Sequence, residues 1–130
     1  MVYPGTHDND TTKSWYRERT ADEQDLIRRY IGRDGHDIVW NFIRLVMAST
    51  ACFAIVPLQD VLNLDNDARM NEPSTLGGNW VWRYRPAALN ASVWERLAEM
   101  VELYGRDPEL WAEFEKEKKA LFEEASQKQE

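Results

Sequence analysis

The chain has 130 residues, and its 16 Lys and Arg against 23 Asp and Glu give a formal net charge of −7. This balance argues against nucleic acid and anionic membranes as partners, because both need clustered basic residues. A single cysteine, Cys52, leaves no internal disulfide, and no apolar run approaches the ~20 residues of a membrane-spanning helix. With no signal-peptide pattern at the start, the expected location is cytoplasmic.

The chain opens with MVYPGTHDNDTT. Val2 and Tyr3 predict the end of a strand, and the polar run HDND, residues 7–10, follows after a Pro-Gly turn. One interpretation is a turn with a helix cap, because Asp and Asn bond readily to their own local backbone. The other is a His-Asp pair at the carboxyl end of a strand, where (β/α)₈ barrels carry their catalytic residues.

A metal site is not expected in these polar runs. A calcium loop starting at Asp8 would need Gly and Glu where Lys13 and Arg19 stand. The same loop started at Asp65 fails at Met70. For a transition metal the sequence offers only one further histidine, so we expect neither a metal nor a cofactor.

Helices are expected next. Residues 11–19 begin a helical turn capped by Asp10 or Thr11. Thr20 and Glu23 form a capping box for a helix that ends near Gly32 or Gly35. Its expected apolar face is Leu26, Ile27, Tyr30 and Ile31. Residues 36–48 are apolar nearly all round, which predicts a helix buried on most sides.

Residues 51–57, ACFAIVP, are a short continuous apolar run that fits a buried strand of a parallel sheet. The run leads into Gln59 and Asp60, polar residues at the carboxyl end of that strand. Asp60 is also consistent with the cap of a short helix.

Residues 64–86 form a long loop rich in turn formers and aromatic residues. Loops of this length are usually functional or disordered, and the aromatic content argues against disorder. The loop either folds its tryptophans inward or shapes a cleft in which the amide of Asn71 or Asn79 faces a polyhydroxylated ligand. Beyond it, Asn90 caps a helix that ends at Gly105, with the apolar face Trp94, Leu97, Ala98, Val101 and Tyr104. A last helix starts at Asp107-Pro108, with Trp111, Phe114, Leu121 and Phe122 as its stripe.

The order strand, helices, strand, long loop, helices is typical of a parallel α/β architecture. Two strands are too few for a stable parallel sheet with both faces covered. We therefore expect residues 1–130 to be a single partial domain, largely helical, that belongs to a larger α/β fold.

Three stretches together, VYPGTHDNDTTKSWYR, AIVPLQDVL and ARMNEPSTLGGNWVWR, resemble the 4-α-glucanotransferases (amylomaltases) of glycoside hydrolase family 77. The resemblance implies the C-terminal part of a TIM (β/α)₈ barrel, with its last two strands and their helices. It also implies transfer of α-1,4-glucan segments to a glucan 4-hydroxyl with retention. The implied partners are an α-1,4-glucan or maltooligosaccharide and the remainder of the catalytic barrel.

By the same resemblance, Asp8 is the carboxylate that stabilises the transition state and His7 is its catalytic neighbour. Substrate contacts are implied for Asn71, Asn9, Gln59 and Trp80. Asp60 supports the site from the last strand. Core packing is the favoured role for at least one of Trp80 and Trp82.

The departures from the family pattern are specific. The nucleophile and the acid/base belong to earlier barrel strands and match nothing in this sequence, so the 130-residue chain alone is expected to be inactive. Pro4 stands where threonine is usual. Ser74 stands where glycine is common, which restricts the backbone if a positive φ is needed there. The alternative function is a non-catalytic carbohydrate-binding or interaction module derived from the barrel.

Overall fold

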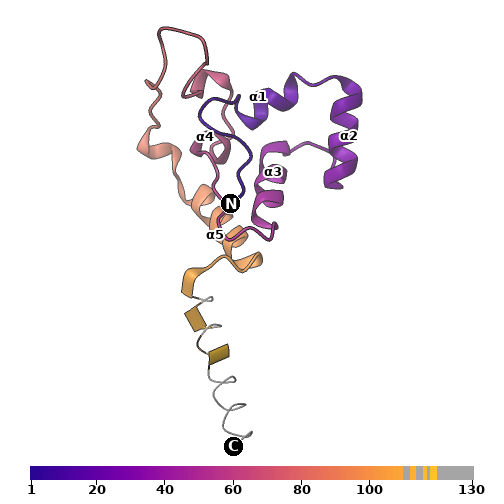
Figure 1. Cartoon of the computed structure of the whole chain (residues 1–130), viewed down its shortest axis with the longest axis vertical. Coiled ribbons are helices and arrows are strands. Elements are labelled where there is room, and N and C mark those ends of the chain that lie inside the picture. The colour runs from indigo at the N-terminus through magenta and orange to yellow at the C-terminus, as the bar shows by residue number, and fades with distance from the viewer. Residues whose placement is uncertain (110–111, 114–115, 117, 120–130) are drawn as a thin grey trace, which may run out of the picture.

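The computed structural model describes residues 1–109, 112, 113, 116, 118 and 119. Within them the chain is largely helical (Figure 1). The elements in order are α1 (Thr12–Arg17), α2 (Ala21–Ile31), α3 (Ile38–Met47), α4 (Leu58–Val61), the 3₁₀ turns η1 (Asn66–Ala68) and η2 (Pro86–Ala88), and α5 (Ala91–Leu103). Helix α3 packs against α1, α4 and α5, and it is the centre of the fold.

The helix ends lie where the sequence predicts them. Thr11 caps α1, and its hydroxyl accepts from Ser14 N. Thr20 and Glu23 form the predicted capping box of α2, which ends at Gly32 in the left-handed conformation with φ +64°. Asn90 caps α5. These local predictions are confirmed, because each cap satisfies backbone amides that the first helical turn leaves without partners.

The core surrounds α3, as its apolar sequence predicts. Ile43 and Val39 are almost fully buried, and Trp40 is 5% exposed. Complete burial of such side chains contributes roughly 1.5–3 kcal/mol each relative to exposure. Other members of the buried cluster are Ile38, Met47, Val61 and Met100, with partly buried neighbours from α1, α2, α4 and α5 around them.

The two predicted strands are reduced to one isolated parallel bridge, between Val2 and Ala54. Val2 N donates to Phe53 O at 2.8 Å, and Ile55 N donates to Val2 O at 3.0 Å. The parallel direction agrees with the predicted neighbouring strands, but the prediction of a buried strand over residues 51–57 is wrong. Phe53 is 67% exposed and Ile55 51% exposed, because no further described segment covers the face on which they lie.

The apolar faces of α2 and α5 are narrower than predicted. On α2, Ile27 and Ile31 pack against the core, whereas Leu26 and Tyr30 are exposed. Leu26 and Tyr30 each precede the packed residue by one position, which turns them about 100° away from it. On α5, Trp94 is likewise exposed, whereas Leu97 and Tyr104 pack against the core.

The long loop is confirmed, since residues 69–85 contain no helix or strand. Beyond α5, Asp107 Oδ1 accepts from Glu109 N at 2.9 Å, as the predicted cap requires. The stripe predicted for the last helix, Trp111, Phe114, Leu121 and Phe122, lies outside the described residues. Across the described part of the chain, none of the helices has the length and apolar content needed to cross a membrane.

Candidate functional site

The polar run HDND, residues 7–10, lies on a short turn that follows the bridge residue Val2 after residues 3–6. Asn9 N donates to Thr6 O at 3.1 Å, which closes the turn. The Asn9 side-chain oxygen accepts from Thr6 N at 2.8 Å and from Thr6 Oγ1 at 2.9 Å. Asn9 therefore uses its side-chain carbonyl to hold the turn in shape, and its predicted contact with substrate stays a prediction. His7 and Asp8 lie at the tip of this turn.

His7 and Asp8 are about half exposed, and their side chains meet. His7 Nε2 lies 3.2 Å from Asp8 Oδ1. The same oxygen accepts from Asn71 Nδ2 at 2.7 Å, and Asn71 N donates to His7 O at 3.1 Å. Within the described chain, Asp8 Oδ2 has no hydrogen-bond partner, so one carboxylate oxygen is fixed and the other is open to a ligand.

Arg69 fastens the two loops to each other. Its guanidinium donates to the main-chain oxygen of Asp8 at 2.5 Å and to Asp10 Oδ1 at 2.6 Å. Its Nε donates to Asn71 O at 2.9 Å. Asp10 Oδ1 also accepts from Asn66 Nδ2 at 2.9 Å. The planar guanidinium therefore sets the position of both Asp8 and Asn71.

Trp80 covers one side of His7. The two ring centroids are 4.9 Å apart and the ring planes are inclined by 43°. Trp80 has φ +63°, and its N–H donates to Met70 O at 2.6 Å. This left-handed conformation folds the loop back on itself. The indole is half exposed, so it is not a core residue.

Gln59 and Asp60 lie in α4, and both line the cavity that His7 borders, but they have different hydrogen-bond partners. Gln59 Nε2 donates to Ala68 O at 3.2 Å. Gln59, His7 and Asn9 help to line one cavity of about 460 Å³. Asp60 is almost completely buried and accepts from Thr12 N at 2.9 Å and from Thr12 Oγ1 at 2.7 Å. Burial raises the pKa of Asp60, although both bonds from Thr12 oppose that rise.

The structure therefore brings His7, Asp8, Asn71 and Trp80 together, and it places Gln59 and Asn9 on an adjoining cavity. Sequence reasoning missed Arg69 and its partner Asp10. The signal for this pair was the presence of a cation in ARMN and a second aspartate in HDND, but nothing in the sequence joins two residues 59 positions apart. Among the described residues, no group of three or more His, Cys, Asp or Glu side chains is arranged to hold a metal ion.

Comparison with known proteins identifies the class. The family model described as 4-alpha-glucanotransferase, glycoside hydrolase family 77, matches residues 1–90. This is more than half of the chain, and the chain belongs to that family.

Individual relatives of the chain come from the same family. A 4-alpha-glucanotransferase of Synechocystis is 50% identical over 107 residues, which are 82% of this chain and 21% of the relative. One from Thermus thermophilus is 43% identical over 108 residues, 78% of this chain and 22% of the relative. An amylomaltase structure from Streptococcus agalactiae, solved in complex with acarbose, superposes with a TM-score of 0.76 at 33% identity, over 79% of this chain and 21% of that chain. The chain thus spans about a fifth of the length of the curated relatives it matches.

Proposed function

We propose that residues 1–130 are the C-terminal part of a (β/α)₈ barrel that acts as a retaining 4-α-glucanotransferase. The single observation that carries this proposal is the Asp8 carboxylate, which Asn71 and His7 hold through Oδ1 while Oδ2 stays open. Asp8 follows the parallel bridge at Val2 by a short turn, and barrel enzymes carry their catalytic groups after the carboxyl ends of parallel strands, which supports this proposal. Family membership supports the same proposal.

In this proposal Asp8 stabilises the transition state and neither attacks nor protonates the glycosidic bond. Retaining transfer requires a carboxylate nucleophile and an acid/base carboxyl about 5–5.5 Å apart, with an oxocarbenium-like transition state between them. Those two groups are assigned to the part of the barrel outside this chain. Asp8 and His7 bind hydroxyl groups of the sugar under attack. If these bonds tighten as the ring flattens, they lower the barrier and do more than improve binding.

The proposed substrate contacts are Asn71, Asn9, Gln59 and Trp80. Trp80 offers a half-exposed indole beside His7, and an aromatic face suits the apolar face of a sugar ring. The substrate is an α-1,4-glucan or maltooligosaccharide. The net charge of −7 fits an uncharged substrate better than a nucleic acid or an anionic membrane.

The free, exposed thiol of Cys52 supports a reducing compartment, so we assign the chain to the cytoplasm.

The remainder of the barrel is the proposed partner of the bridge region. Met1, Tyr3, Phe53 and Ile55 expose large apolar side chains on the two bridged segments. Contiguous exposed apolar residues on paired backbone segments mark a surface that packs against further protein. Neighbouring barrel strands would cover this surface and complete the active site.

A chimera tests the proposal. Residues 1–90 replace the matching segment of the Synechocystis relative, and the product is assayed for glucose release from maltotriose. The chimera is expected to be active and the isolated chain inactive. Asp8→Asn should lower kcat by about 100- to 1000-fold, the usual cost of one electrostatic partner in a transition state. Asp22→Asn, at an exposed carboxylate on α2, is the matched control. Equal turnover by Asp8→Asn and Asp22→Asn would refute the role of Asp8.

The alternative is a non-catalytic carbohydrate-binding module, which the half-exposed indole of Trp80 also supports. The two functions differ in one result. A folded chimera that binds maltooligosaccharides but releases no glucose would favour the binding module over the catalytic segment.

A further inference from the structure

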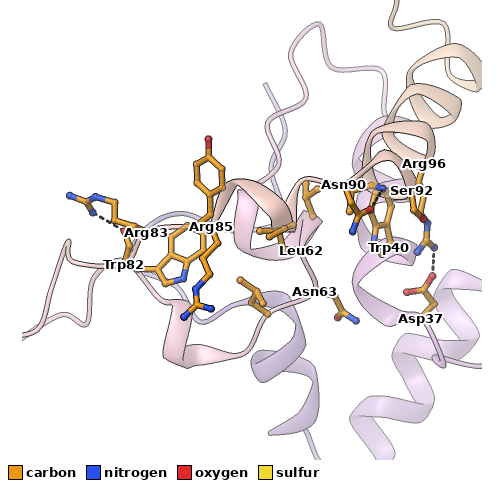
Figure 2. A pocket seen from close by; sticks show the side chains of 15 residues that line it. Asp37, Trp40, Leu62, Asn63, Trp82, Arg83, Arg85, Asn90, Ser92 and Arg96 are labelled. Carbon is orange, nitrogen blue, oxygen red and sulfur yellow. Dashed lines mark hydrogen bonds and ion pairs between the residues drawn. The ribbon is translucent and has the colours of Figure 1, made fainter.

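A second cavity, of about 490 Å³, has neither His7 nor Asp8 in its lining. Figure 2 shows this cavity from close by. Its walls come from the N-terminal ends of α3 and α5, the residues after α4 and the loop at residues 82–85. In the view of Figure 2, Trp82 and Arg85 lie toward one end, Asp37 and Arg96 lie toward the other, and Leu62 lies between them. The volume is within the range of about 300–1,000 Å³ that small-molecule sites occupy.

One wall is rigid and polar. The Arg96 guanidinium lies 4.1 Å from the centroid of the Trp40 ring, and it is paired with the carboxylate of Asp37. Trp40 is buried in the core, so its ring gives the guanidinium a fixed support. Asn90 and Ser92 add polar groups at the start of α5.

The opposite wall is aromatic and carries an unused cation. Tyr84 is 46% exposed, and Trp82 is partly buried. The Arg83 guanidinium donates to the main-chain oxygens of Trp80 and Trp82, at 3.0 Å and 2.7 Å, and so fixes the loop. The side chain of Arg85 lines the cavity and has no partner among the described residues.

This combination suits a neutral, polyhydroxylated ligand better than an anion. The charge of Arg96 is balanced by Asp37, and Arg83 is occupied by carbonyl groups, which leaves Arg85 as the one free cation of this described wall. A compact anion is usually held by several converging cations or amides. Sugar rings instead need flat apolar faces with planar polar groups beside them, and Trp82, Tyr84, Arg85 and Asn90 supply these.

The cavity is also linked to the candidate site by the chain itself. Trp80 lies against His7, and Trp82, two residues further along, lines the cavity. Two residues span at most about 7 Å of backbone. One short segment of the loop therefore borders both the candidate site and the second cavity.

We propose that this cavity is a second glucan-binding site, which holds part of an α-1,4-glucan outside the reacting centre. The proposal rests on the proposed function, because that function supplies the ligand class. Tyr84 and Trp82 stack on sugar rings, and Arg85 and Asn90 bond to sugar hydroxyls.

Calorimetric titration of the 130-residue chain with maltoheptaose tests this site. Arg85→Ala and Tyr84→Ala should each weaken binding about tenfold, the usual effect of removing one hydrogen bond to a charged group or one stacked ring. The matched controls are Arg33→Ala and Tyr30→Ala on or next to α2. Both control side chains are exposed, lie outside the cavity and have no side-chain partner within the described residues, so both control variants should bind maltoheptaose like the parent. Far-UV circular dichroism verifies that each variant is folded.

The outcomes separate this proposal from the proposed function. Weakened binding in the two cavity variants, with parent-like controls, supports the second site. Parent-like maltoheptaose binding in both cavity variants overturns it, and an active chimera would then leave the proposed function intact. Binding of inorganic phosphate that depends on Arg85, with no effect of Arg85→Ala on maltoheptaose, would also overturn it.

Discussion

Asn71 Nδ2 donates to Asp8 Oδ1 at 2.7 Å, although the two residues are 63 positions apart in the chain. This bond fixes the half-exposed carboxylate from the side opposite its free oxygen. Arg69 holds both residues by their main-chain oxygens, so the loops at residues 6–10 and 69–80 act as one unit. The orientation of Asp8 therefore depends on Asn71 as well as on its own turn.

The first prediction concerns this bond in the active chimera. Asn71→Ala should lower kcat/KM about tenfold to a hundredfold, because a hydrogen bond to a charged group contributes roughly 1.5–3 kcal/mol. Asn71→Asp should lower kcat/KM further, since it brings a like charge beside Asp8 and favours the protonated form of one of the two carboxylates. Steady-state kinetics on maltotriose measure the effect. Higher activity for Asn71→Asp than for Asn71→Ala would contradict this account.

The second prediction concerns the buried Asp60 and pH. Because burial raises its pKa, the folded chain binds a proton at Asp60 more readily than the unfolded chain does. Its contribution to stability is therefore present below the unfolded pKa and is lost as the pH rises through the folded pKa. Asp60→Asn removes this titration while Asn can still accept from Thr12 N.

Thermal melts at about pH 3.5 and pH 7 check the sign. The Tm of Asp60→Asn relative to the parent should rise between the lower and the higher pH, since only the parent acquires a buried charge. The salt-bridged Asp65, whose pKa the hydrogen bond from Lys13 lowers, acts in the opposite direction. That contribution is common to both proteins and cancels in their difference. A Tm difference that is constant with pH would show that folding leaves the pKa of Asp60 unchanged, and one that falls would show that folding lowers it; either result contradicts the prediction.

The third prediction concerns Ser74, which has φ +67°. The family resemblance implies that glycine is common at this position, and Ser74 has the positive φ that favours glycine. Ser74→Gly should stabilise the chain by about 0.5–1 kcal/mol, because relief of left-handed strain exceeds the added entropy of the unfolded glycine. Ser74→Ala, which keeps the Cβ, should give no gain. Denaturant unfolding of both variants and the parent measures these changes in stability. Equal midpoints for Ser74→Gly and the parent would show that Ser74 is not strained.

Much of the local structure follows from the sequence alone. Local features need partners only a few residues away, so the sequence pattern predicts them. Examples are the capping box at Thr20, the cap at Asn90 and the left-handed Gly32. The prediction of a buried strand at residues 51–57 is wrong, because burial of Phe53 and Ile55 depends on segments that are not near them in the chain.

Some residues of the candidate site could likewise be predicted from the sequence, and others could not. The resemblance placed His7, Asp8, Asn71 and Trp80 in one site, and the structure brings these side chains together. The clamp by Arg69 was not foreseen, since a guanidinium that bonds to main-chain oxygens leaves no pattern in the partner's side chains. Asp60, which was expected to support the site, lines the same cavity as His7 and also accepts two hydrogen bonds from Thr12 at the start of α1, so its support of the site stays a prediction.

The last prediction concerns Arg106, which closes the turn after α3. Its guanidinium donates to the main-chain oxygens of Met47 at 2.6 Å, Ser49 at 2.8 Å and Ala51 at 3.0 Å. Arg106→Met keeps a similar apolar stem but leaves three partly buried carbonyls unpaired, so it should destabilise the chain by about 2 kcal/mol or more. Arg33→Met, at an exposed arginine, should stay within about 0.5 kcal/mol of the parent. Urea unfolding should show a lower midpoint for Arg106→Met at an unchanged slope. Equal midpoints for the two methionine variants would mean that solvent satisfies these carbonyls as well as Arg106 does.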